Sequence, residues 1–157
     1  GTWAFTGDDN TVDLLCSSTS AGDCDTVTVN ITVGANTTGG ADDNVFQIYF
    51  GETSTADVDN MVANFTIDGD GNTINTDIDG TSVALTLVSD NSASTAATGN
   101  TFTIDVDGNG DINGHTINID VTGGGSTYDI TQSGLGDNTI EATFSGDGQD
   151  VDITQSD

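Results

Sequence analysis

The residues best placed to do chemistry are aspartates and asparagines that alternate with other residues in two short segments. In the clearer one, Asp105, Asp107, Asn109 and Asp111 supply oxygen ligands at alternate positions, with a glycine at the sixth position. Calcium loops of the EF-hand type share this spacing. Their closing acid is missing here, because Thr116 stands at the twelfth position. The segment therefore predicts either a calcium site or a solvated Asp-Gly turn whose side chains cap their own backbone.

A shorter form of the same pattern places Asp68, Asp70 and Asn72 at alternate positions. The chain has 26 acidic residues and neither Lys nor Arg, which gives a formal charge of −26. Every favourable charge interaction must then involve cations from solution or from a partner. Diffuse counterion binding is the default expectation, and calcium is the cofactor expected if either segment is a specific site.

Two cysteines, Cys16 and Cys24, flank a small polar segment. This arrangement predicts a disulfide that closes a loop in an oxidising compartment. A zinc site is disfavoured, since two thiolates without a nearby histidine are an incomplete ligand set. We therefore expect a secreted or cell-surface protein.

Catalysis has little support in the sequence. His115 is the only histidine, and no Lys or Arg accompanies it. Its neighbours Gly114 and Thr116 predict a surface turn that leads into a strand. We expect no enzyme. The acidic charge disfavours nucleic acid as a partner, and the absence of a long apolar run disfavours membrane insertion.

The elements that must position these residues are short strands. Apolar and polar residues alternate along most of the chain, which favours strands over disorder. Only two of the acids are glutamates, and the 21 glycines are typical of tight turns. The chain has no proline, which agrees with strands that are paired on both edges.

An internal repeat organises the strands. The segment 128–133 recurs as 151–156, and the segment 117–123 recurs as 140–146, so the two interleaved units share one period. Similar units return upstream with looser spacing, and each is often preceded by Asn-Thr. They occupy residues 65–71, 74–80, 83–88 and 102–108, and the insertion at 89–99 is expected to be a polar loop.

The repeat predicts an all-β fold, a β-solenoid of stacked two-strand turns, because one amphipathic unit cannot bury its apolar face alone. A β-sandwich of pilin or surface-layer type is the alternative. We expect one domain over residues 1–157. Its less regular part, with the cysteine loop, is 1–44, and its repeat region is 45–157, clearest at 100–157.

In the last third of the chain, Ser126, Gln132, Gly134, Gly136 and Asn138 follow one another at short spacings, and Gln155 repeats the position of Gln132. This order resembles the curlin repeat proteins, which form the functional amyloid called curli in bacterial biofilms. Their pattern is Ser, five residues, Gln, one residue, Gly-x-Gly-Asn, and then Ala and a second Gln on the return strand. The resemblance implies secretion as an unfolded chain and assembly into an extracellular matrix fibre. Stacking of the repeat itself predicts ladders of Asn, Gln, Ser and Thr side chains, for which Ser126, Gln132, Asn138 and Gln155 are the candidates.

The two ends of the chain predict how copies would assemble. The sequence closes on a complete strand unit that holds Val151 and Ile153, and we expect this unit to accept a further strand. Trp3 and Phe5 lie in an alternating segment at the start, which either covers its own core or is donated to a neighbour. A head-to-tail contact between copies would not close and would make a homopolymeric filament. A strand-donating pilin or surface-layer subunit and a calcium-dependent adhesin are the alternatives.

Overall fold

The computed structural model of the chain describes residues 1–16, 26–34, 42–51, 58–91, 99–108 and 114–156. Within these ranges every regular element is a β-strand. The strands are β1 (Thr2–Phe5), β2 (Thr11–Cys16), β3 (Thr28–Val33), β4 (Val45–Phe50), β5 (Val58–Asp59), β6 (Val62–Asp68), β7 (Thr73–Thr81), β8 (Ala84–Asp90), β9 (Thr101–Gly108), β10 (Thr116–Thr122), β11 (Thr127–Ser133), β12 (Thr139–Ser145) and β13 (Asp150–Gln155).

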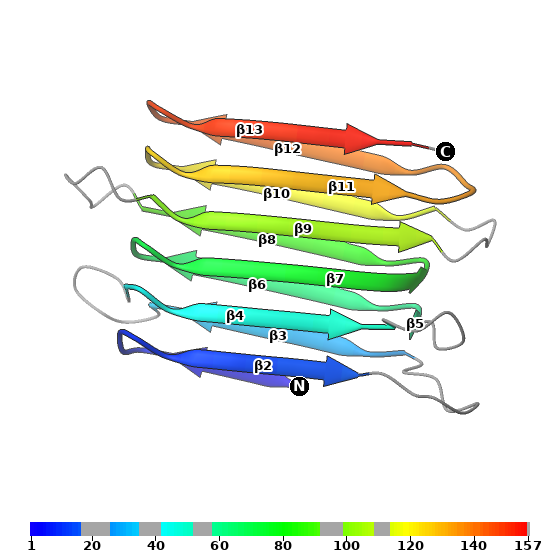
Figure 1. Ribbon diagram of the computed structural model, residues 1–157, viewed down its shortest axis with the longest axis horizontal. Coiled ribbons are helices and arrows are strands. Elements are labelled where there is room, and N and C mark those ends of the chain that lie inside the picture. Colours follow the sequence, from blue (N-terminus) through cyan, green and yellow to red (C-terminus); the bar gives the residue numbers. More distant parts are fainter. Residues whose placement is uncertain (17–25, 35–41, 52–57, 92–98, 109–113, 157) are drawn as a thin grey trace.

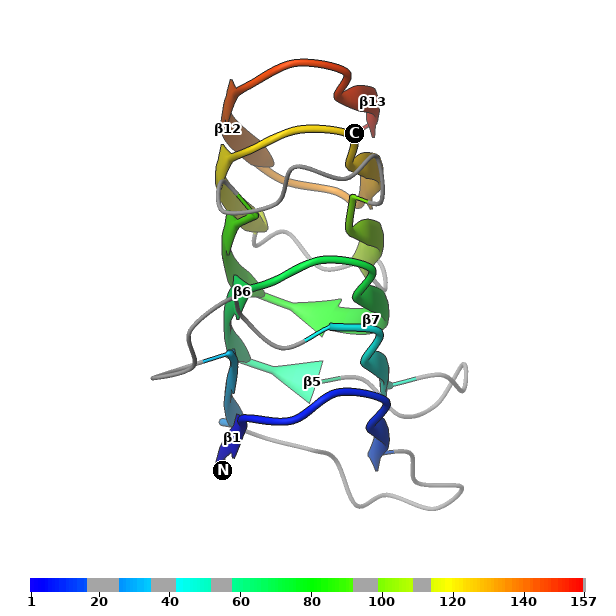
Figure 2. The same cartoon turned by 90° about the vertical axis from the view of Figure 1, so that its left-hand side faces the viewer.

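The strands form two parallel sheets that face each other. The first sheet has the order β1-β3-β6-β8-β10-β12, and the second has the order β2-β4-β7-β9-β11-β13, with β5 paired to β7. The chain alternates between the sheets, so one strand of each makes a coil, and the coils stack from the N-terminus to the C-terminus (Figures 1 and 2). This confirms the predicted β-solenoid, and the β-sandwich alternative was wrong.

The register between coils follows the repeat where the repeat is regular. In the last coils Thr116 pairs with Thr139 and Thr127 pairs with Asp150, and both pairs have the offset of the repeat. Elsewhere the offset is larger, as for Asn30 and Asn64, which pair although |i−j| is 34. The strands thus keep their register although the connections between them differ in length.

The core lies between the sheets and consists of side chains from alternate positions of every strand, as the pleat requires. Side chains at equivalent positions of successive coils form columns along the stack. One column of the second sheet holds Phe102 and Tyr128, whose rings stack with centroids 5.0 Å apart and planes 7° apart. Phe144 of the first sheet packs against Tyr128 from across the core, at 4.9 Å. The aromatic side chains therefore link both neighbouring coils and facing sheets.

The N-terminal part contributes three strands, β1, β2 and β3, to the same stack. β1 pairs with β3 of its own chain, with Trp3 beside Ile31. The expected polar loop at 89–99 begins later than predicted, because β8 continues to Asp90 and Ser89 is buried. No helix in the described part of the chain is long and apolar enough to cross a membrane.

Candidate functional site

The first feature that repeats along the solenoid is a corner lined by polar side chains, which we call the amide corner. Each of its residues comes one position before a strand of the second sheet. The residues are Asn10, Asn44, Asn72, Asn100, Ser126 and Gln149. Asn44, Asn72 and Asn100 are at most 1% exposed, and Ser126 is fully buried. Buried amides must be hydrogen-bonded, so their partners decide whether this corner is stable.

The asparagines bond to one another along the stack. Asn72 Oδ1 accepts two hydrogen bonds from Asn44, one from the backbone N (3.1 Å) and one from Nδ2 (3.0 Å). Asn72 donates the same pair of bonds to Asn100 Oδ1, at 2.9 and 3.2 Å. Asn10 repeats the arrangement with Asn44, and Asn100 N donates to Ser126 Oγ at 3.0 Å. A continuous asparagine ladder therefore joins successive coils.

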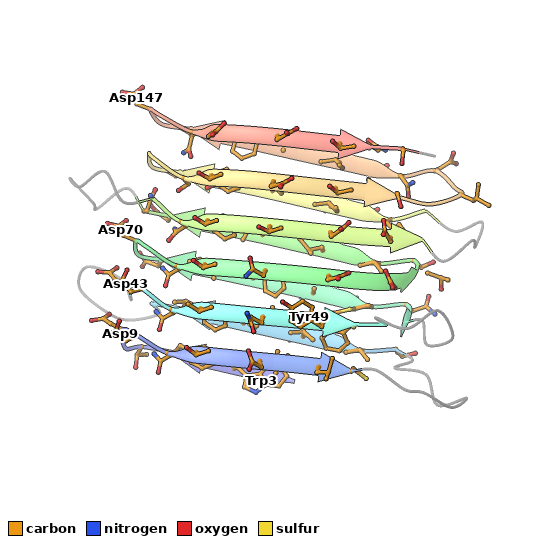
Figure 3. The ribbon with its side chains drawn as sticks, in the orientation of Figure 1. Trp3, Asp9, Asp43, Tyr49, Asp70 and Asp147 are labelled. Atoms are coloured by element: carbon orange, nitrogen blue, oxygen red, sulfur yellow. The ribbon has the colours of Figure 1, made fainter. Side chains whose placement is uncertain are left out.

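Aspartates make a parallel stack just outside this ladder. Asp42 N donates to Asp8 Oδ1, and Asp70 N donates to Asp42 Oδ1, both at 2.9 Å. Asp9 and Asp43, at equivalent places, have left-handed backbone with φ of 59° and 56°. Aspartate tolerates this conformation better than most residues. Figure 3 shows Asp9, Asp43, Asp70 and Asp147 one above another along this edge.

The opposite corner, which we call the mixed corner, is filled differently. Its residues come one position before the strands of the first sheet, and they are Val27, Met61, Val83, His115 and Asn138. Met61 and Val83 are buried at 0% and 1% exposure. The corner is thus apolar in the middle of the stack and polar toward its C-terminal end.

His115 lies in the mixed corner and is 1% exposed, so the prediction of a surface turn was wrong. Its Nδ1 accepts a hydrogen bond from Val83 N (3.2 Å), and its backbone N donates to Asn138 Oδ1 (3.0 Å). Burial lowers the pKa of the imidazole, and the charge of Asp107 opposes this shift. The sequence showed a histidine between Gly and Thr, but it could not show that this position faces the core.

Carboxylates line the outer face of the second sheet. Asp77 pairs with Asp105, and Asp79 pairs with Asp107, in neighbouring strands. Desolvation raises the pKa of Asp105, and the charges of Asp107, Asp77 and Asp129 raise it further. Desolvation and the charge of Asp107 also raise the pKa of Asp77. Like charges at strand spacing therefore oppose one another across this face.

The predicted calcium ligands are spread over different places in the fold. Asp105 and Asp107 lie on the outer face of β9, whereas Asn109 and Asp111 fall outside the described residues. In the shorter segment, Asp68 ends β6 and Asp70 belongs to the aspartate stack, while the side-chain oxygen of Asn72 is used by the asparagine ladder. Within the described ranges no three His, Cys, Asp or Glu side chains converge to hold a metal ion.

Of the two predicted disulfide partners, Cys16 ends β2 and Cys24 falls outside the described residues. Cys16 is disulfide-bonded. The disulfide is therefore attached at the last residue of β2.

The residues that carry the curlin resemblance lie in or beside the two corners. Gln132 is buried in β11 and pairs with Gln155 in β13. Gln155 Nε2 donates to the backbone oxygen of Asn138 at 2.6 Å. Ser126 and Asn138 each accept a hydrogen bond from the backbone of the preceding coil. Each of these four side chains thus contacts a neighbouring strand or corner.

The coils at the two ends of the 157 residues have core side chains that remain partly exposed. At one end, Val151 and Ile153 of β13 are 39% and 40% exposed, although their partners Tyr128 and Ile130 are buried. At the other end, Trp3 and Phe5 of β1 are partly buried against the core. One edge of each end strand has no neighbour among the described strands. A further strand could pair with the open edge of either coil.

A shallow open groove crosses the outer face of the first sheet. The strands that form it are β8, β10 and β12, and the outward side chains that line it are Thr86, Val88, Asn118, Asp120, Glu141 and Thr143. The groove contains two carboxylates but no buried polar side chain that points into it, so it defines no chemical site.

Comparison of the chain with protein families, with curated proteins and with solved structures finds no significant match. The fold itself places the chain in the class of parallel β-solenoids.

Stacking of the repeat predicts ladders of polar side chains, but sequence reasoning did not place Asn10, Asn44, Asn72 and Asn100 in one of them. The signal that could have revealed this ladder is an asparagine directly before a strand, preceded by Asp or Gly, at residues 8–10, 42–44, 70–72 and 99–100. By themselves, the Asn-Thr pairs predict only where a strand starts. The irregular spacing of these segments hides their equivalence.

Proposed function

We propose that the chain is a structural subunit of an extracellular filament or biofilm matrix fibre, and that copies assemble head-to-tail by β-strand stacking. The observation that carries this proposal is the repetition of parallel pairing from coil to coil, because each coil presents the same kind of strand edge to the next. In the stack of the described strands, the terminal coils have an open edge, and apolar core side chains such as Ile153 are 40% exposed there. A second copy that paired with these edges would bury the side chains and satisfy the open backbone groups.

The internal architecture supports the same proposal. All the coils described are joined by parallel pairing and by side-chain ladders, so each coil is a template for the next. A copy that continued the stack would repeat contacts which the chain already makes within itself. The contact would join unlike surfaces, so it would propagate rather than close. The curlin resemblance of the sequence and the disulfide at Cys16 agree with an extracellular role.

Charge would control this assembly. If a second copy continued the second sheet, its β2 would lie beside β13, and its Asp13 would lie beside Asp152. Asp152 already pairs with Asp129 in its own chain. Three carboxylates would then stand in one column, and no Lys or Arg is present to neutralise them. We therefore expect cations or acidic buffer to promote assembly.

Negative-stain electron microscopy of the 157-residue chain, in buffer with and without millimolar calcium, tests the proposal. The informative variant is Val151→Asp, which places a charge on the end coil. Its matched control is Val62→Asp, because Val62 is also 39% exposed but lies on the outer face of β6. We expect filaments from the wild type and from the control, and none from Val151→Asp.

Equal loss of filaments in both variants would contradict stacking through the end coils. Particles of the wild type that stay monomeric in both buffers would overturn the filament itself. If such monomers gained thermal stability with calcium, the calcium-dependent adhesin would become the better explanation.

A further inference from the structure

The bonds of His115 fix its protonation state. Because the backbone N–H of Val83 donates to His115 Nδ1, that nitrogen carries no hydrogen. The ring proton must therefore lie on Nε2. This atom is buried and has no hydrogen-bond partner among the described residues. A neutral imidazole with the proton on Nε2 is the only form that fits the bond to Val83.

His115 also serves as a link in a short ladder. Asn138 Oδ1 accepts a hydrogen bond from the backbone N of His115, and His115 Nδ1 accepts the corresponding bond from Val83 one coil earlier. The imidazole Nδ1 thus accepts a backbone hydrogen bond from the preceding coil, as the side-chain oxygen of Asn138 does one coil later. Unlike that oxygen, Nδ1 loses its acceptor lone pair when it binds a proton.

We propose that His115 is an acid-sensitive joint between the coil that contains Val83 and the coil that contains His115. Protonation places a hydrogen on Nδ1, directly opposite the backbone N–H of Val83. Two donors cannot share a bond, so the imidazole must rotate away or the corner must open. The amide corner has no titrating acceptor in the asparagine ladder, and it stays closed at the same pH.

The groups around the imidazole provide little stabilisation for a positive charge on the ring. The backbones of Gly108 in β9 and Gly134 after β11 pack against its ring, and Asn138 and Val83 are neutral. Asp107 in β9 is the acid whose charge acts on it, and Asp137, next to Asn138, is exposed. Burial outweighs Asp107, so the pKa of His115 lies below its ordinary value of 6.5.

The sign of the pH effect follows from this shift. A lowered pKa in the folded state means that stability is present above the unfolded pKa and is lost as the pH falls below it. The raised pKa values of Asp68, Asp77 and Asp105 act in the opposite direction, because protonation of these carboxylates on acidification stabilises the folded state. A global unfolding curve mixes both effects, so the test must be local.

Hydrogen exchange at the Val83 amide provides the local test, with the Asn72 amide as an internal control, since it bonds to Asn100 Oδ1 and not to a titrating atom. Below about pH 6 we expect the protection factor of Val83 to fall by up to about tenfold per pH unit, relative to that of Asn72. In His115→Asn, where asparagine can accept the bond as Asn138 does, the ratio should not change with pH. Parallel pH profiles for the two amides in the wild type would overturn the proposal.

A second measurement needs no variant. The chain has one histidine, so the nitrogen signals of its imidazole in a proton–nitrogen NMR spectrum need no assignment. At neutral pH we expect an unprotonated Nδ1 and a protonated Nε2, and a midpoint of titration below the ordinary pKa of 6.5. A proton on Nδ1 at neutral pH, or a midpoint that is not lowered, would overturn the proposal. Neither measurement depends on filament formation.

Discussion

The amide corner and the mixed corner occupy equivalent places in the coil, since each lies one residue before a strand, but they are filled by different chemistry. At the amide corner, buried asparagines such as Asn72 hold successive coils by hydrogen bonds from both backbone and side chain. At the mixed corner, Met61 and Val83 fill the same kind of space by packing. The amide corner therefore depends on unbroken polar pairing, whereas the mixed corner depends on volume.

The strongest way to test this difference is Asn72→Leu, which keeps the approximate size of the side chain and removes its polar atoms. The backbone N and Nδ2 of Asn44 both lose their acceptor in a buried place. We expect a loss of about 3 kcal/mol or more in the free energy of unfolding, since each buried donor without a partner costs about 1–3 kcal/mol.

Chemical denaturation followed by circular dichroism measures this loss. Asn118→Leu is the matched control, because Asn118 is exposed on the outer face of β10, and its effect should stay within about 0.5 kcal/mol. Similar losses in the two variants would show that the asparagine ladder is not what holds the amide corner together.

Substitutions of Met61 test whether the mixed corner depends on side-chain volume and not on polar pairing. Met61→Ala should cost about 2–3 kcal/mol, because the side chain is fully buried and its removal leaves a cavity. Met61→Leu, which introduces the same residue as the first test, should cost less than about 1.5 kcal/mol. Thermal unfolding of both variants checks this order. If leucine were as damaging at 61 as at 72, the two corners would not differ as described.

The aspartate stack gives the smallest effect and sharpens the comparison within the amide corner. Asp42→Asn keeps an oxygen for the backbone N of Asp70 and removes one of several neighbouring charges. We expect a stabilisation below about 1 kcal/mol at low salt, which shrinks as salt is added. Asp42→Ala removes the acceptor as well and should be destabilising. Melting temperatures measured at two salt concentrations separate the variants, and a stabilising alanine would contradict the role of the oxygen.

Much of the fold could be predicted because its signal is local. Alternating residues gave the strands, and the regular repeat near the C-terminus gave the true register of Thr116 with Thr139 and of Thr127 with Asp150. The site was harder to predict. Asn72 looked like one ligand of a calcium loop, because the residues near it in the sequence are acidic, whereas its partners Asn44 and Asn100 are each 28 residues away.

The sequence by itself determined that this chain forms alternating strands, that its coils repeat, and that no internal cation balances its 26 acids. The tertiary structure decided which residues share a corner, because connections of unequal length make the offset between bonded partners larger at Asn10 and Asn44 than at His115 and Asn138. Asn72 joins a ladder, and His115 is buried against the coil that contains Val83, only because the coils stack. Strand alternation depends on neighbours in the chain, whereas a corner is formed by residues that meet only when the coils are stacked.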